Sequence, residues 1–62
     1  MNKIENRIIK LLGIGLTNPK KLIAEISAIL ELSKSDISVE VMRLLEDKRI
    51  WFDIDWNLRI NK

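Results

Sequence analysis

The chain offers few side chains that could carry out catalysis. Its 62 residues include no cysteine, histidine or tyrosine, so the commonest nucleophiles, general bases and soft metal ligands are missing. Its carboxylates are scattered, and none accompanies a plausible nucleophile. Gly13 and Gly15 flank Ile14, but a lone G-x-G falls short of a phosphate-binding loop and indicates a helix stop and a turn. We therefore expect no enzyme activity, no metal site, no cofactor and no small-molecule ligand.

Hydroxyl groups and cations are the remaining candidates for chemistry. Ser33, Ser35 and Ser38 lie close together at what looks like the start of a helix. Small hydroxyls and the free amides of a helix N-terminus can together bind a phosphate. Lys and Arg total 11 against 9 Asp and Glu, giving a net charge of +2. This weak basic balance does not by itself identify a partner.

Hydrophobic periodicity and capping residues predict three helices, at about 3–12, 19–30 and 34–47. In the second helix, Asn18 is the expected cap, and the proline after it suits the first helical position. In the third, Ser33 opens a capping box that is completed by an aspartate three residues later.

The first helix is expected to begin at an Asn2 cap and to end at Gly13. The apolar residues 14–16 that follow are too few for a helix. Either a one-bridge edge strand or a plain connector fits them.

The character of the sequence changes at residue 49, and residues 49–61 predict a hairpin. Ile50, Phe52 and Ile54 alternate with polar or aromatic positions, as in a strand. Residues 55–57 favour a turn, and Leu58 and Ile60 alternate in a second short strand. The predicted core consists of aliphatic residues and one phenylalanine: Ile4, Ile8, Leu12, Leu22, Ile26, Leu30, Leu32, Ile37, Val41, Leu44, Ile50, Phe52, Leu58 and Ile60.

Length and composition bound the architecture. Sixty-two residues suffice for one domain but not for two cores. No stretch reaches the roughly 18 consecutive apolar residues of a membrane span. Residues 1–16 also lack the pattern of a signal peptide. We therefore expect a cytoplasmic protein without a membrane partner.

The stretch from Leu32 to Ile50 resembles the turn and recognition helix of winged helix-turn-helix regulators from bacteria, archaea and viruses. Their pattern is roughly Leu-Ser-x-Ser-x-Val-Ser-x-x-Leu-x-x-Leu-x-Glu-x-x-Gly-Ile. The matching positions here are Leu32, Ser33, Ser35, Ile37, Ser38, Val41, Leu44, Glu46 and Ile50. Three helices followed by a hairpin is also the order of elements in that family. Two glycines typical of the family are replaced, one by Arg49 and one by Glu31 at the tight turn.

The resemblance implies a mainly α fold with a small β-hairpin, as one domain over 1–62. It also implies a small transcriptional regulator that binds double-stranded DNA in a sequence-specific manner, with helix 34–47 in the major groove and hairpin 49–61 as the wing. One such module buries little DNA surface, so a homodimer is expected. The residues implied to contact DNA are Lys20, Lys21 and Lys34 on phosphates, Ser35, Ser38, Val39 and Arg43 on the bases, and Arg59 on the wing.

Three features favour an alternative, a winged-helix module that binds another protein as an inhibitor or adaptor and does not bind DNA. Helix 34–47 carries more acidic than basic residues, which opposes phosphate binding. Val39 and Met42 lie three apart on its outward face, where they can contact thymine methyls, a protein partner or a larger core. Trp56 near the hairpin tip has little core to join and suits a partner surface.

Overall fold

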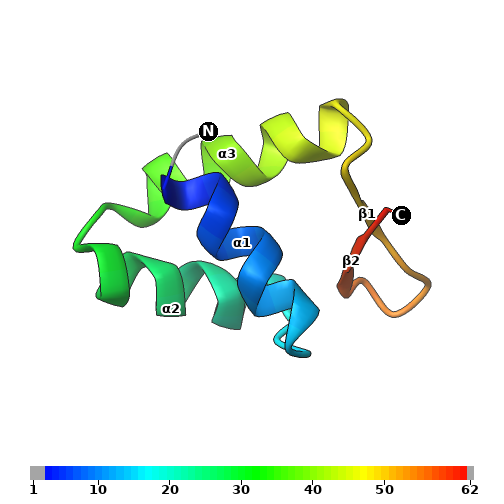
Figure 1. Cartoon of the computed structure of the whole chain (residues 1–62), viewed down its shortest axis with the longest axis horizontal. Helices are drawn as coiled ribbons and strands as arrows, with labels where there is room; N and C mark the ends of the chain where they lie inside the picture. The colour runs from blue at the N-terminus through cyan, green and yellow to red at the C-terminus, as the bar shows by residue number, and fades with distance from the viewer. Residues whose placement is uncertain (1–2, 62) are drawn as a thin grey trace.

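The computed structural model describes residues 3–61 as three helices followed by a two-stranded antiparallel hairpin (Figure 1). The helices are α1 (Lys3–Gly13), α2 (Pro19–Leu30) and α3 (Lys34–Glu46), and the strands are β1 (Ile50–Phe52) and β2 (Leu58–Ile60). This mainly α, winged-helix-like arrangement confirms the predicted fold class. The predicted cap at Asn2 lies outside the described residues.

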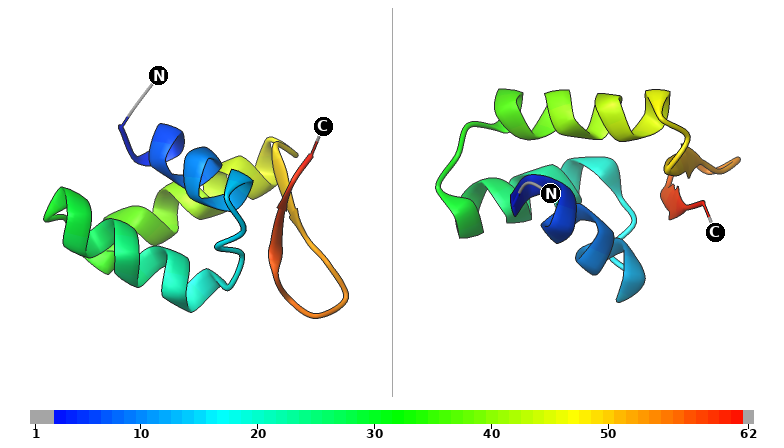
Figure 2. Two further views of the ribbon diagram at one scale, coloured as in Figure 1. Left: turned by 60° about the horizontal axis from the view of Figure 1, so that its bottom comes forward. Right: turned by 45° about the horizontal axis from the view of Figure 1, so that its top comes forward.

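The three helices pack against one another, and the hairpin closes one end of the core. Each helix contacts the other two, while β2 packs on α1 and β1 on α3. Figure 2 shows the hairpin beyond the C-terminal end of α3, away from the turn between α2 and α3. The buried hydrophobic side chains that form the core are aliphatic: Ile8, Leu11, Leu12, Leu22, Ile26, Ile37, Val41, Leu44, Ile50 and Leu58.

The predicted starts of α2 and α3 are confirmed. Asn18 has extended backbone dihedrals, and its Oδ1 accepts a 3.0 Å hydrogen bond from the backbone N–H of Lys21. Ser33 Oγ likewise accepts the backbone N–H of Asp36 at 3.2 Å. Both side chains satisfy amides that have no partner within the helix.

All three helices end in the same way, with a residue in the left-handed conformation. These residues are Gly15 (φ 100°), Glu31 (φ 54°) and Lys48 (φ 60°). After each one, the next backbone N–H donates to the carbonyl five residues earlier, at 3.0, 3.2 and 2.9 Å. The prediction that α1 ends at Gly13 is confirmed, because Gly13 is its last helical residue, and Gly15 makes the turn that follows. The left-handed position after α3 is occupied by Lys48, one residue before Arg49.

The hairpin is shorter than predicted. Phe52 pairs with Leu58 and Ile50 with Ile60. The chain leaves β1 at Asp53, whose backbone N–H donates to the Asn57 carbonyl at 2.9 Å and closes the loop. The alternation therefore breaks before Ile54, which lies in the loop and is 93 % exposed.

The connector between α1 and α2 touches the hairpin through one backbone hydrogen bond. The N–H of Leu58 donates to the carbonyl of Thr17 at 2.8 Å. Residues 14–16 form no strand, so the plain connector is the correct alternative. The bond attaches β2 to the start of α2 and thereby positions the wing relative to the helices.

Four side chains depart from the predicted core. Leu32 and Phe52 were expected inside, but each is more than one third exposed. Leu32 follows the left-handed residue Glu31 in the turn between α2 and α3, and Phe52 is the last residue of β1, next to the loop of the hairpin. Leu11 and Glu40 are buried instead. Helical periodicity placed Glu40 outside, but α1 packs across α3 and covers a wider face than the apolar stripe alone.

Candidate nucleic-acid interface

One face of α3 is covered by the core and the opposite face is open. Ile37, Val41 and Leu44 point inward and are buried. Of the α3 residues expected to contact DNA, Lys34, Ser35, Val39 and Arg43 are exposed, whereas Ser38 is half-buried. The packing of α1, α2 and β1 on the inner side leaves the outer face free.

Val39 and Met42 do not belong to the core. Their exposed fractions are 54 % and 61 %, which excludes the larger core that their apolar character allowed. Together with Arg43, Glu46 and Asp47 they line an open hollow on the outer face of α3.

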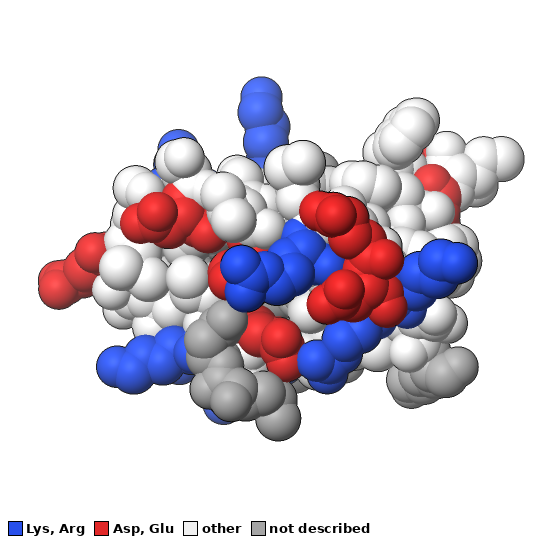
Figure 3. Space-filling view, turned by 90° about the horizontal axis from the view of Figure 1, so that it is seen from above, with Lys and Arg blue, Asp and Glu red and all other residues white. Residues whose placement is uncertain are grey.

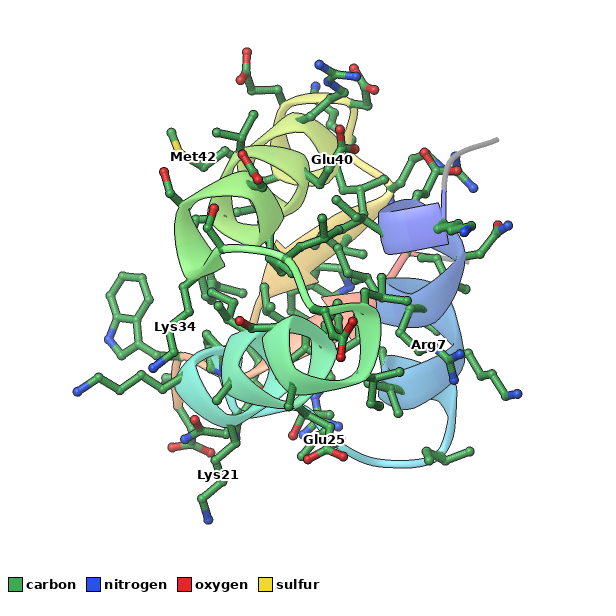
Figure 4. The ribbon with its side chains drawn as sticks, turned by 90° about the vertical axis from the view of Figure 1, so that its left-hand side faces the viewer. Arg7, Lys21, Glu25, Lys34, Glu40 and Met42 are labelled. Carbon is green, nitrogen blue, oxygen red and sulfur yellow. The ribbon has the colours of Figure 1, made fainter. Side chains whose placement is uncertain are left out.

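Three exposed lysines lie at the starts of α2 and α3. Lys20 and Lys21 lie in the first turn of α2, Lys34 opens α3, and all three are exposed. Figure 4 shows Lys21, Lys34 and Met42 on the same side of the molecule, opposite the side that α1 covers. Within residues 3–61, none of the three lysines forms an ion pair.

The two arginines expected to bind DNA are paired with carboxylates. Arg43 Nη1 lies 3.5 Å from Oε1 of Glu40, one turn away on α3. The other Glu40 oxygen, Oε2, is buried and makes no hydrogen bond with the described residues. Arg59 Nε lies 2.8 Å from Oδ2 of Asp53 across the hairpin. The expected contribution of both cations to a basic surface is therefore reduced.

Asp53 organises the loop of the hairpin. Its Oδ1 accepts the backbone N–H groups of Asp55 and Asn57 at 2.9 and 3.0 Å, and its Oδ2 accepts Arg59. The Arg59 hydrogen bond, helped by the two amides, holds the pKa of the Asp53 carboxyl below its usual 3.8 despite an opposing desolvation effect. This network was not predicted, although an Asp two and four residues before the amides of a turn is a recognisable signal.

The hairpin loop also presents aromatic side chains to solvent. Trp56 is 71 % exposed and has a left-handed backbone (φ 62°), which is unusual for a bulky residue. Its ring meets that of Phe52 edge to face, with centroids 5.5 Å apart and an interplanar angle of 65°. The expected exposure of Trp56 is confirmed, and its contact with Phe52 was missed.

The charges around α3 are mixed. Figure 3, which looks down on α3, shows acidic and basic side chains interspersed without a continuous basic surface. Within α3, Asp36, Glu40 and Glu46 oppose Lys34 and Arg43. Glu46 and the following Asp47 lie at the C-terminal end of the helix, while Lys34 and Asp36 share its first turn.

Neither a cluster of metal ligands nor a membrane-spanning helix is found in the described part of the chain. Among residues 3–61, no group of three or more carboxylates converges as metal ligands would. No helix in this range combines the length and the apolar character needed to cross a bilayer.

Searches of protein-family models, of curated proteins and of solved structures each found no match.

Proposed function

We propose that this chain binds double-stranded DNA as a small transcriptional regulator, with α3 in the major groove and the β1–β2 hairpin as the wing. The observation that carries the proposal is the open outer face of α3, with the exposed Lys34 at its N-terminal end and the exposed Lys20 and Lys21 in the first turn of α2. In helix-turn-helix proteins the N-terminal residues of the second helix contact the base edges. The positive end of the helix dipole at Ser33 adds to this attraction for phosphate.

Three unpaired lysines predict a definite salt dependence. Each phosphate neutralised contributes about −0.9 to the slope of log K against log salt concentration. Three contacts therefore weaken binding about fortyfold between roughly 50 and 200 mM salt. A homodimer bound to two half-sites would make twice as many phosphate contacts, so the slope of log K against log salt concentration would be twice as steep. The same experiment therefore distinguishes a monomer from a homodimer on DNA.

The test is a titration of the ¹⁵N-labelled protein with a short random-sequence duplex at these two salt concentrations. Amide shifts concentrated in α3, the start of α2 and the hairpin, and weakening steeply with salt, support the proposal. Replacing Lys20, Lys21 and Lys34 by Gln should flatten the slope, whereas Lys10→Gln on α1 should leave it unchanged. Absence of any shift at the lower salt concentration refutes DNA binding.

A protein-binding module is the second candidate, favoured by a different observation. Arg43 and Arg59 are engaged by carboxylates, while Ile54 and Trp56 project from the hairpin loop into solvent. Large exposed apolar side chains held on a rigid loop are typical of interaction hot spots. An inhibitor or adaptor would use this loop and the Val39–Met42 face without any DNA contact, and the titration above separates the two functions.

A further inference from the structure

We propose that α3 recognises the C5-methyl groups of thymine in the major groove, using the side chains of Val39 and Met42. This inference rests on the proposed DNA binding and specifies which base chemistry the site reads.

The first argument is the position of the two side chains. Val39 and Met42 are three residues apart, so they are neighbours on one helix face. They are among the exposed large apolar residues of the chain and lie in the middle of the open face of α3. A helix that docks with this face therefore presents two apolar side chains to the floor of the groove.

The second argument is what the face lacks. Bidentate recognition of adenine uses Asn or Gln, and α3 contains neither. Bidentate recognition of guanine uses Arg or Lys. Arg43 lies next to Met42 and is paired with Glu40 at 3.5 Å, and Lys34 lies at the first position of α3. The base edges that remain for apolar side chains are the methyl groups of thymine.

The third argument is the position of the exposed lysines, which favours DNA as the occupant of this face. Lys34 lies five residues before Val39, at the first position of α3, and Lys20 and Lys21 are exposed in the first turn of α2. Lys21 and Lys34 lie on the same side of the molecule as Met42 (Figure 4), so phosphates have cationic partners there. Glu46 and Asp47 at the other end repel phosphates and orient the helix with its N-terminal half toward the DNA.

The test compares four short alternating duplexes: d(A-T), d(A-U), d(G-C) and d(G-5-methyl-C). Uracil lacks the thymine methyl, and 5-methylcytosine carries a methyl at the same position in the groove. Burying one such group changes affinity about fourfold. We expect d(A-U) to bind about fourfold more weakly than d(A-T) for each contacted thymine, and d(G-5-methyl-C) to bind more tightly than d(G-C) by a similar factor.

The Val39→Ala/Met42→Ala double variant should lose both preferences while it keeps its fold, since both side chains are exposed. Ile14→Ala, which shortens an even more exposed apolar side chain in the α1–α2 connector, should keep both preferences. Equal binding to all four duplexes would overturn methyl recognition and leave DNA binding standing. Preferences that persist in the double variant would also overturn it. No binding to any duplex at low salt would overturn DNA binding and this inference together.

Discussion

Arg59 on β2 donates from Nε to Oδ2 of Asp53 at 2.8 Å, so the cation expected to anchor the wing on DNA is held within its own hairpin. The same carboxylate accepts the amides of Asp55 and Asn57, which close the loop. One residue therefore both shapes the wing and reduces its positive charge. A wing with a released Arg59 should bind phosphate better, at some cost to the order of the loop.

Asp53→Asn should strengthen DNA binding. The amide oxygen of Asn can still accept the loop N–H groups, but its NH₂ group cannot accept from Arg59. The released guanidinium gains one phosphate contact, which steepens the log K against log salt slope by about 0.9. Asp55→Asn removes the same charge without freeing Arg59 and should leave the slope unchanged. Equal slopes for the two variants would contradict this account.

The hairpin loop should open in acid, at a pH below the usual pKa of an aspartate. Because the pKa of Asp53 is lowered in the folded loop, its stabilising effect is complete above the unfolded value of 3.8. That effect is lost as pH falls from there toward the lower folded pKa. The amide shifts of Asp55 and Asn57, followed from about pH 6 to about pH 2, should change with a midpoint below 3.8. A midpoint at or above this value, or the same transition in Asp53→Asn, would show that Asp53 does not control the loop.

Glycine should be favoured at the left-handed ends of α2 and α3. Glu31→Gly and Lys48→Gly each remove the steric strain of a Cβ at positive φ. Each should raise the free energy of unfolding by about 0.5–1 kcal/mol, measured by urea denaturation. Gly15→Ala should have the opposite sign because φ is 100° there. Gly13→Ala, in the last turn of α1 with open space around the new Cβ, should not destabilise.

Glu40→Leu should stabilise the protein. The buried Oε2 makes no hydrogen bond with the described residues, and the pairing of Oε1 with the exposed Arg43 is long. An apolar side chain of similar size removes this desolvation penalty and should raise the free energy of unfolding by about 1 kcal/mol. Glu46→Leu, an exposed position on the same helix, should stay within about 0.5 kcal/mol. A loss of stability in Glu40→Leu would show that the carboxylate is satisfied in solution.

Leu58 and Leu32 should differ sharply when each is shortened to alanine. Leu58 is fully buried between the helices and the hairpin, so Leu58→Ala should cost about 2–5 kcal/mol. A chain of this size has little stability to lose, and thermal unfolding should show a largely unfolded variant near room temperature. Leu32→Ala should cost less than about 1 kcal/mol, because this side chain is 38 % exposed. If the two variants lost similar amounts of unfolding free energy, Leu32 would have to be counted as a core residue.

The order and limits of the helices followed from local chemistry and could be predicted from the sequence. The Asn18 and Ser33 caps act on amides three residues away, so no distant contact is needed to recognise them. The alternation from Ile50 similarly indicated a strand. The open face of α3 also followed from periodicity, because a helix on a small core buries one side only.

Tertiary structure decided the features in which distant segments meet. Glu40 is buried because α1 crosses α3, and no spacing within α3 indicates how wide a face another helix covers. The pairing of Arg59 with Asp53 depends on the hairpin register, which a broken alternation at Ile54 obscured. Helical propensity and capping are thus properties of neighbouring residues and can be read along the chain. The charge and shape of the candidate interface depend on which side chains from separate elements come together, and only the folded structure specifies them.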